Sequence, residues 1–218
     1  MALAIEALRA TLLDVAAQLK LDLSHAQADA LLGYLALLWR WNTTYNLTAV
    51  RDPAQMVTHH LADCLAVVGP LRREGGARAL RLLDVGSGGG LPGVVIAILN
   101  PTLEVTCVDS VGKKAAFVVQ VGGELGLRNL RAQHTRVEQL RSGVFDVVAS
   151  RAFASLSDFT RLTRPHLGPS GVWMAMKGKL PGDELASLGA GIDVFHVEQL
   201  AVPGLAAERS LVWMRPTP

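Results

Sequence analysis

The chain has 218 residues, half of them hydrophobic, which is enough for a sizeable buried core, and we expect no long disordered part. The formal net charge is only +2, so overall charge by itself indicates no polyanionic partner. The two cysteines, Cys64 and Cys107, lie outside any CxxC spacing, which supports neither a disulfide framework nor a zinc site. No apolar run approaches the ~20 residues of a membrane span, and the N-terminal stretch lacks the regions of a signal peptide. We therefore expect a soluble, cytoplasmic protein without membrane contact.

Residues 1–70 carry the patterns of helices. Ser24 and Gln27 have capping-box spacing before a periodic apolar run. Asp52 and Pro53 combine an N-cap with proline at the first helical position. The segment is too short and too apolar to stand alone, so we expect a helical cap that packs on a sheet formed by residues 71–218. The stretch REGGAR at 73–78 predicts a loop.

Beyond residue 80, short apolar runs alternate with helical segments, which is typical of a doubly wound parallel sheet. The predicted strands lie at 80–85, 103–108, 129–133 (weak), 145–149 and 171–176, and the predicted helices near 92–99, 112–125 and 152–164. The tail has two further strand-like runs, 195–202 and 209–214, joined by a Pro-Gly loop, which predicts an antiparallel hairpin. The fold class is thus α/β and Rossmann-like, with residues 71–218 as one compact unit.

Positive charge gathers in residues 110–179, which hold eleven Lys and Arg residues against four acidic ones. Such an excess suits an anionic partner near a site. A solvated basic face explains it equally well, and the charge alone does not choose between the two.

The stretch DVGSGGGLPG at 84–93 follows the first predicted strand and fits two glycine patterns. The dinucleotide pattern G-x-G-x-x-G is met by Gly88, Gly90 and Gly93. The competing pattern begins where the strand ends, with Asp84, Gly86, Gly88 and Gly90. An acid at this place is unfavourable for a pyrophosphate, which needs amides and a positive helix end.

A ligand with an ammonium group and no phosphates suits Asp84 better, and S-adenosylmethionine is such a ligand. The glycines would let the backbone approach its methionine part. Asp109 stands about twenty residues after the loop, at the end of the second strand, where its carboxylate can accept hydrogen bonds from the ribose hydroxyls. The sequence therefore indicates a methyltransferase, with a nicotinamide-dependent oxidoreductase as the alternative.

The absence of two motifs reduces the number of candidate target atoms for methylation. The segment 145–156 has no Asn/Asp-Pro-Pro element of the kind used to hold an exocyclic amino group. Neither cysteine sits on a loop after a strand, as carbon-5 pyrimidine chemistry would need. Guanine N7 has a free lone pair and no proton, so alignment suffices and no catalytic residue acting as a general base is required.

Six ordered blocks carry a resemblance to a known family: WNTTYNLTAVRDPAQMVTHHLADCL, DVGSGGGLPG, DSVGKKAAF, TRVEQL, SRAFASL and MKGKLP. Together they resemble the small-subunit ribosomal RNA guanine-N7 methyltransferase G family, also called glucose-inhibited division protein B, from about residue 25 to the tail. The resemblance implies a class I methyltransferase fold and a bacterial enzyme that converts S-adenosylmethionine to S-adenosylhomocysteine. The implied partner is the small ribosomal subunit, and the implied target is N7 of the guanine at position 527 of 16S rRNA.

The resemblance also implies individual site residues. Gly86, Leu91, Val137 and Glu138 match cofactor contacts, and Arg151 matches a residue that holds either the cofactor carboxylate or an RNA phosphate. With the residues argued above, the expected cofactor set is Asp84, Gly86, Gly88, Gly90, Leu91, Asp109, Val137, Glu138 and Arg151.

Several other side chains are candidates for RNA contact, and we expect the protein to act as a monomer. The candidates are Arg51, His59, Lys113, Lys114 and Lys177, of which Lys113 and Lys114 begin a helix where lysine is unfavourable for the dipole. His59 and Asp63 share a helix face, but further ligands are not apparent and we expect no metal. The aromatic residues Trp39, Trp41 and Tyr45 favour core packing over base stacking. A non-catalytic ribosome-binding protein and a methyltransferase of another nucleic acid remain alternatives.

Overall fold

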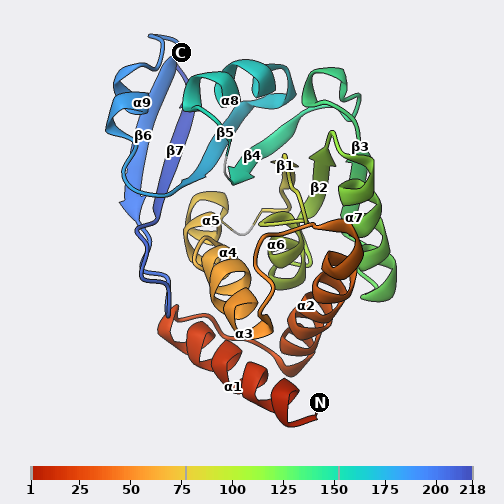
Figure 1. Cartoon of the computed structure of the whole chain (residues 1–218). Helices are drawn as coiled ribbons and strands as arrows, with labels where there is room; N and C mark the ends of the chain where they lie inside the picture. Colours follow the sequence, from red (N-terminus) through yellow and green to blue (C-terminus); the bar gives the residue numbers. More distant parts are fainter. Residues whose placement is uncertain (1, 77, 152, 218) are drawn as a thin grey trace.

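The computed structural model describes residues 2–76, 78–151 and 153–217, and its centre is a single sheet (Figure 1). The strand order is β3-β2-β1-β4-β5-β7-β6. The first five strands in this order are parallel, and β7 runs antiparallel to both neighbours. The strands are β1 (Arg81–Val85), β2 (Glu104–Asp109), β3 (Leu130–His134), β4 (Phe145–Arg151), β5 (Leu167–Lys177), β6 (Ile192–Gln199) and β7 (Ser210–Pro216).

The predicted α/β fold with an antiparallel C-terminal hairpin is confirmed. All predicted strands form, including the weak one near 129–133, which is the edge strand β3. Strand β5 begins four residues earlier than predicted because Leu167 already pairs with Phe145 of β4. The hairpin does not simply extend the sheet, since β7 inserts between β5 and β6.

Helices before the sheet are α1 (Ala2–Gln18), α2 (His25–Tyr45), α3 (Pro53–Met56), the π-helical turn η1 (Val57–Ala62), α4 (Asp63–Leu65) and α5 (Val68–Gly75). The capping box of Ser24 and Gln27 is present, and the Asp52 side chain accepts a hydrogen bond from the backbone N–H of Ala54. The loop prediction at 73–78 starts too early because α5 continues to Gly75; Ala77 lies outside the described residues.

The remaining helices alternate with the strands and are α6 (Gly93–Leu99), α7 (Gly112–Glu124), α8 (Leu156–Thr163) and α9 (Gly182–Ala186), with 3-10 turns η2 (Val137–Gln139) and η3 (Arg164–His166). The helix expected at 152–164 begins only at Leu156, because Ser155 is its N-cap and accepts from the backbone N–H of Asp158. Ala152 lies outside the described residues.

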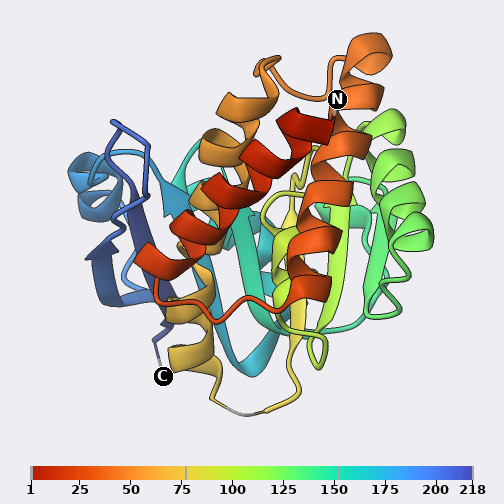
Figure 2. The same cartoon turned by 90° about the horizontal axis from the view of Figure 1, so that it is seen from below.

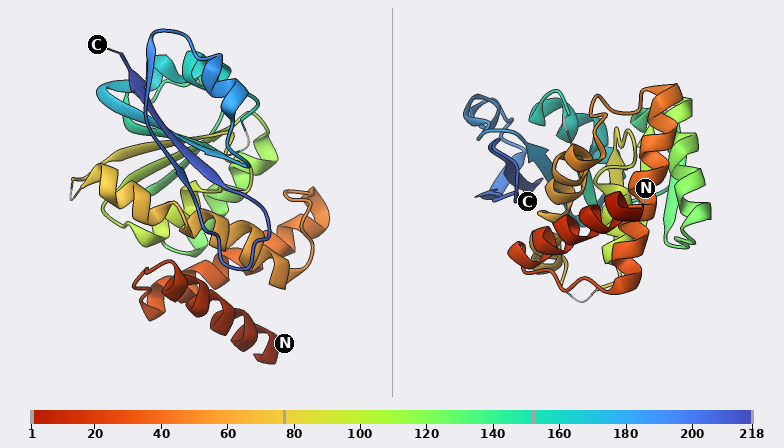
Figure 3. Two further views of the ribbon diagram at one scale, coloured as in Figure 1. Left: turned by 90° about the vertical axis from the view of Figure 1, so that its left-hand side faces the viewer. Right: turned by 60° about the horizontal axis from the view of Figure 1, so that its bottom comes forward.

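Two hydrophobic clusters cover the two faces of the sheet, as alternation along the strands requires. Leu82 of β1 belongs to the cluster shared with the N-terminal helices, α6 and α7, whereas Leu83 belongs to the cluster shared with α8. Helix α1 lies below the sheet in Figure 1 and crosses the other N-terminal helices in Figure 2. It packs mainly on α2 and η1, so the expected cap forms two layers and only its inner helices approach the sheet (Figure 3).

One edge of the sheet gathers the chain segments that form the site. Parallel strands β1, β2 and β4 end there, and antiparallel β7 begins there, since Ser210 pairs with Lys177 at the end of β5. Open α/β sheets bind ligands at this carboxyl edge, where the strand order reverses. Within the described residues, no helix has the combined length and apolarity needed to cross a bilayer.

Candidate active site

The glycine loop after β1 adopts a conformation that needs its glycines. Gly86, Gly88 and Gly90 have positive φ angles of 68°, 58° and 85°, a region that costs other residues about 1–2 kcal/mol each. A Cβ atom on Gly86 or Gly88 would meet nothing within 4 Å, so open space lies over the loop at both positions. The buried hydroxyl of Tyr34 donates to the Gly89 carbonyl at 2.7 Å, so the helical cap supports the loop from behind.

Asp109 connects this loop to the next helix. Its Oδ2 accepts from the Gly88 N–H at 2.9 Å, and its Oδ1 accepts from the Val111 N–H at 2.8 Å. A carboxylate has about four lone-pair positions, so both oxygens can still accept from a ligand. The side chain is 7% exposed and borders a cavity of about 470 Å³ at the carboxyl edge. We call it the adenosine-side cavity, after the ribose contact that the sequence predicts for Asp109. It is also lined by Gly86, Lys114, Val137, Glu138 and Phe153.

A second cavity of about 580 Å³ lies on the other side of the loop, and Gly86 borders both. We call it the outer cavity. It is lined by the loop, by the cap and by the strand ends, among them Gly88, Leu91, Thr48, His59, His60, Asp63, Arg151, Lys177 and Arg209. Both volumes fall within the range of about 300–1,000 Å³ that is usual for small-molecule sites.

Asp84 borders neither cavity, although the sequence suggested that it contacts a ligand. Its side chain is fully buried and accepts from the Gly93 N–H at 2.8 Å. Burial raises the pKa of Asp84 to about 7, although the Gly93 amide and the Arg151 charge oppose the rise. Its Oδ1 has no hydrogen-bond partner within the described part of the chain. Asp84 therefore lies beneath the loop, and its expected contact with a ligand ammonium stays a prediction.

Gly93 decides between the two glycine patterns. A Cβ on Gly93 would lie 2.5 Å from Cys107 Sγ and 2.9 Å from Asp84 Oδ2, so glycine is required for packing. Its N–H, which a dinucleotide pyrophosphate would need, already binds Asp84. Gly90 is also a packing residue rather than a lining one, since its Cβ would collide with Val94. Its expected contact with the cofactor stays a prediction.

The remaining predicted cofactor residues divide between the cavities. Val137 and Glu138 of η2 line the adenosine-side cavity with Asp109, while Leu91 and Arg151 line the outer one. Their roles as ligand contacts stay predictions, but their positions are compatible with one extended ligand that passes over Gly86.

The candidate RNA-facing residues do not form one group. Arg51 is exposed, borders neither cavity and donates to Asn46 Oδ1 at 3.2 Å. Exposed Lys113 also borders neither, whereas Lys114 lines the adenosine-side cavity and exposed His59 the outer one. Lys177 lines the outer cavity, but its Nζ lies 2.8 Å from Glu184 Oε1 and 13% of its side chain is exposed. The Lys177 ammonium is thus paired with a carboxylate of α9, and its contact with RNA stays a prediction.

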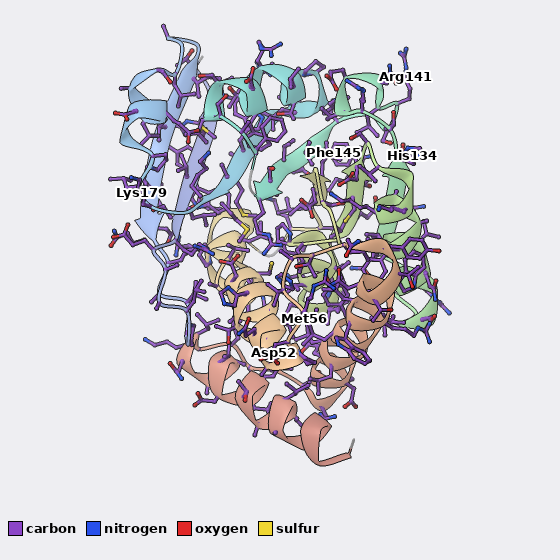
Figure 4. All side chains as sticks on the ribbon, in the orientation of Figure 1. Asp52, Met56, His134, Arg141, Phe145 and Lys179 are labelled. Atoms are coloured by element: carbon purple, nitrogen blue, oxygen red, sulfur yellow. The ribbon has the colours of Figure 1, made fainter. Side chains whose placement is uncertain are left out.

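The basic excess of residues 110–179 is likewise distributed over the molecule. Arg141 and His134 lie at the β3 edge of the sheet, and Lys179 lies at the opposite side near β6 (Figure 4). Arg141 and Lys179, which belong to the same basic stretch of sequence, therefore lie at different sides of the molecule.

Burial keeps His60 of the outer cavity and the two cysteine thiols in their neutral forms. Burial and the charge of Arg151 lower the pKa of His60 to about 4, and its Nε2 lies 2.8 Å from Thr48 Oγ1. Burial raises the pKa of the Cys64 and Cys107 thiols, so neither supplies a thiolate at neutral pH. Across the described residues, no group of three His, Cys, Asp or Glu side chains is placed to hold a metal ion.

The aromatic prediction was partly wrong. Trp41 packs on Phe117, with ring centroids 5.4 Å apart, as core packing predicts. Trp39 and Tyr45 are 49% and 41% exposed, although the Tyr45 ring still packs on Trp41 with ring centroids 4.9 Å apart.

Two residues of the outer cavity were not found from the sequence in their observed roles. Arg209 directly precedes β7. Because β7 is antiparallel to β5, its start lies at the carboxyl edge of the parallel strands, and the predicted hairpin could have indicated this position. Asp63, considered above only as a metal ligand, binds both Arg151 and Arg209.

Comparison with known proteins identifies the family of the chain. A family model described as "rRNA small subunit methyltransferase G" matches residues 27–212. The "Ribosomal RNA small subunit methyltransferase G" of Leptothrix cholodnii is 62% identical over 208 residues, which cover 95% of each chain. The protein of the same name from Acidovorax ebreus is 62% identical over 206 residues, or 91% of each chain.

Among solved structures, the chain is similar to the 1,6-didemethyltoxoflavin-N1-methyltransferase of Burkholderia thailandensis, a structure with bound S-adenosylhomocysteine. The TM-score is 0.59 at 19% identity, with 85% of this chain and 90% of that chain covered, which shows a shared methyltransferase fold. From the family match, the high identity to relatives over nearly their whole length and the shared fold, the chain belongs to the rRNA small subunit methyltransferase G family.

Proposed function

We propose that the chain transfers a methyl group from S-adenosylmethionine to N7 of a guanine in small-subunit rRNA. One observation carries this proposal: two cavities meet at Gly86, on the carboxyl edge of the sheet, with Asp109 on one side and Arg151 on the other. Such a pair of cavities suits a methyl donor and an acceptor that approach one another over the glycine loop.

The residues present fit the methyl donor. A Cβ at Gly86 or Gly88 would occupy the space over the loop, so the backbone is bare where a ligand must pass. The Asp109 carboxylate is held by two backbone N–H groups and retains capacity for ribose hydroxyls. Val137 and Glu138 would lie along the adenine, and Arg151 would hold the carboxylate of the amino-acid tail.

The chemistry asks little of the side chains beyond alignment. S-adenosylmethionine supplies an electrophilic methyl group on a sulfonium when it is bound. Guanine N7 has a lone pair and no proton, so a neutral His60 and protonated thiols are compatible with the reaction. The rigid loop, tied to Asp109 and Tyr34, serves to keep donor and acceptor in line, which is a proximity effect.

We further propose that the target is the guanine at position 527 of 16S rRNA, and that the chain acts as a cytoplasmic monomer on the small ribosomal subunit. The high identity to proteins named as small-subunit rRNA methyltransferases supports the substrate class. The cations at the mouth of the outer cavity, Arg151 and Arg209, suit a phosphate-bearing partner.

Methyl-labelled S-adenosylmethionine and small subunits that lack the modification test the proposal. We expect label on N7 of one guanine, mapped by cleavage of the RNA at the modified base. Absence of transfer to both free and assembled rRNA would refute the proposal. Label on an exocyclic nitrogen or a pyrimidine would refute the N7 assignment, and binding of a nicotinamide dinucleotide in its place would favour the oxidoreductase alternative.

A further inference from the structure

A buried carboxylate joins two arginines in the outer cavity. Asp63 stands where the π-helical turn η1 gives way to α4, and its side chain is 3% exposed. Its Oδ2 lies 3.2 Å from Arg151 Nη1, and its Oδ1 lies 2.8 Å from Arg209 Nε. One short acidic side chain therefore orients two guanidinium groups at once, and π-helical turns are frequent at functional sites.

The two guanidinium groups retain unused donors. Arg151 Nη1 also donates to the His59 carbonyl at 3.4 Å, and Arg209 Nη1 donates to the Glu208 carbonyl at 2.9 Å. The Nη2 atoms of both arginines have no acceptor among the residues that the structure describes. About a quarter of each side chain is exposed, and both line the outer cavity.

The charge balance of this cluster favours an anion. Two guanidinium groups face one carboxylate, so the cluster carries a net positive charge. A guanidinium can present one edge to Asp63 and another to an oxyanion, since its donors lie in a planar fork. The Asp63 carboxylate would offset the repulsion between the two cations and keep both forks aimed at the cavity.

The two arginines come from strands at different distances from the glycine loop. Arg151 ends β4, the neighbour of β1, and so stands beside the glycine loop. Arg209 precedes β7, which lies beyond β5, two strands further along the sheet. Strands are spaced by about 4.8 Å, so the two chain segments enter roughly 10 Å apart. Arg151 thus enters beside the glycine loop, and Arg209 enters farther from it.

We propose that Asp63 is a positioning residue that holds Arg151 and Arg209 as a clamp for two oxyanions, in which Arg209 binds a backbone phosphate of the RNA beside the target guanine. This assignment deepens the proposed function and rests on it. Arg151 takes the donor carboxylate, and Asp63 couples the two subsites because each of its oxygens holds one arginine.

Three variants test the clamp: Arg209→Gln, Asp63→Asn and, as a control, Arg215→Gln. Arg215 lies on the same strand β7 at its far end, 55% exposed and paired with Asp193, so its loss removes the same charge away from the cavity. Affinity for S-adenosylhomocysteine is measured by calorimetry. The KM for unmodified small subunits and its dependence on salt are measured by methyl transfer.

Arg209→Gln is expected to raise the KM for subunits about tenfold or more, to reduce the slope of log KM against log salt by about 1, and to leave S-adenosylhomocysteine affinity within about twofold. Asp63→Asn should weaken both affinities, with partial recovery in Asp63→Glu, whereas Arg215→Gln should leave both as in the wild type. A purely structural role of Asp63 would lower the melting temperature without changing the salt slope, and that result would overturn its positioning role.

Two further outcomes would overturn the RNA assignment of Arg209. Weakened S-adenosylhomocysteine binding with an unchanged salt slope would mean that Arg209 holds the donor carboxylate. If the Arg209→Gln protein has the wild-type affinity for S-adenosylhomocysteine and the wild-type KM and salt slope for subunits, Arg209 holds neither oxyanion. Failure of the wild type to methylate subunits would refute the proposed function itself. That failure is distinguishable from failure of the clamp, because it is measured on the wild type and the clamp is measured on the variants.

Discussion

Asp109 offers the sharpest test of the site, because a single carboxylate holds the glycine loop and faces the adenosine-side cavity. The change is Asp109→Asn, which keeps the shape but removes the charge. An amide oxygen can replace one of the two acceptors used by Gly88 and Val111, but its NH2 group cannot accept from the other N–H. The variant therefore loses one acceptor oxygen, which we propose for the ribose, and leaves one backbone N–H without its partner.

The magnitude follows from the kind of bond that is lost. Hydrogen bonds to a charged group contribute about 1.5–3 kcal/mol. Since about 1.4 kcal/mol corresponds to a tenfold change in affinity, the dissociation constant for S-adenosylhomocysteine should rise roughly 10- to 150-fold. The assay is calorimetric titration at neutral pH, with thermal unfolding as a check that the variant is folded.

Asp146→Asn is the matched control. Asp146 Oδ2 accepts from the Arg81 N–H at 2.8 Å, a bond of the same kind at the amino ends of the strands, away from both cavities. It should alter stability without altering affinity. A folded Asp109→Asn protein whose affinity is within about twofold of the wild type would refute the reasoning and remove Asp109 from the site.

Four more outcomes are expected. Gly86→Ala should cost about 1–2 kcal/mol of stability, because φ is 68°, and should weaken S-adenosylhomocysteine binding at least tenfold by calorimetry, because its Cβ enters the space over the loop. Asp84 has a raised pKa of about 7 in the folded state, so its contribution to stability is present below pH 3.8 and is lost as pH rises through 7. Asp84→Asn should remove that loss of stability when the free energies of unfolding at pH 5 and pH 8 are compared. His60 has the opposite sign, since a lowered pKa of about 4 means that its contribution is present above pH 6.5 and is lost as pH falls toward 4; His60→Gln should flatten that acid limb. Lys177→Met should lower the melting temperature by breaking the pair with Glu184, while the salt dependence of subunit binding stays as in the wild type; a reduced salt slope would restore Lys177 to the RNA-facing set.

Much of the fold was accessible from the sequence because its signals are local. A strand, a turn and the following helix lie within about thirty residues, so alternation of apolar runs sufficed to place the strands. The capping box at Ser24 and the N-cap at Asp52 are likewise contacts between near neighbours. The same holds for the glycine loop and Asp109, which are linked by a bond across 21 residues between adjacent strand ends.

The sequence does not show how deeply a residue of a pattern is buried. Asp84 and Gly90 belong to the glycine pattern, yet both are buried beneath the loop and serve packing. Lys177 stands at a strand end like a ligand residue, but Glu184 of α9 pairs with it. Pattern spacing identifies the loop, and it does not say which side chains of the loop point outward.

The sequence by itself determined the α/β class, the glycine loop and the acid after β2, because neighbouring residues and strand ends dictate them. Only the tertiary structure decided that β7 inserts between β5 and β6. That topology brings Arg209 to Asp63 across 146 residues of chain, while Arg151 reaches the same carboxylate across 88. The physical reason is that local patterning sets which face of a strand is buried, whereas strand order is set by how whole faces pack. The outer cavity is made of contacts between distant segments, so it follows from the strand order.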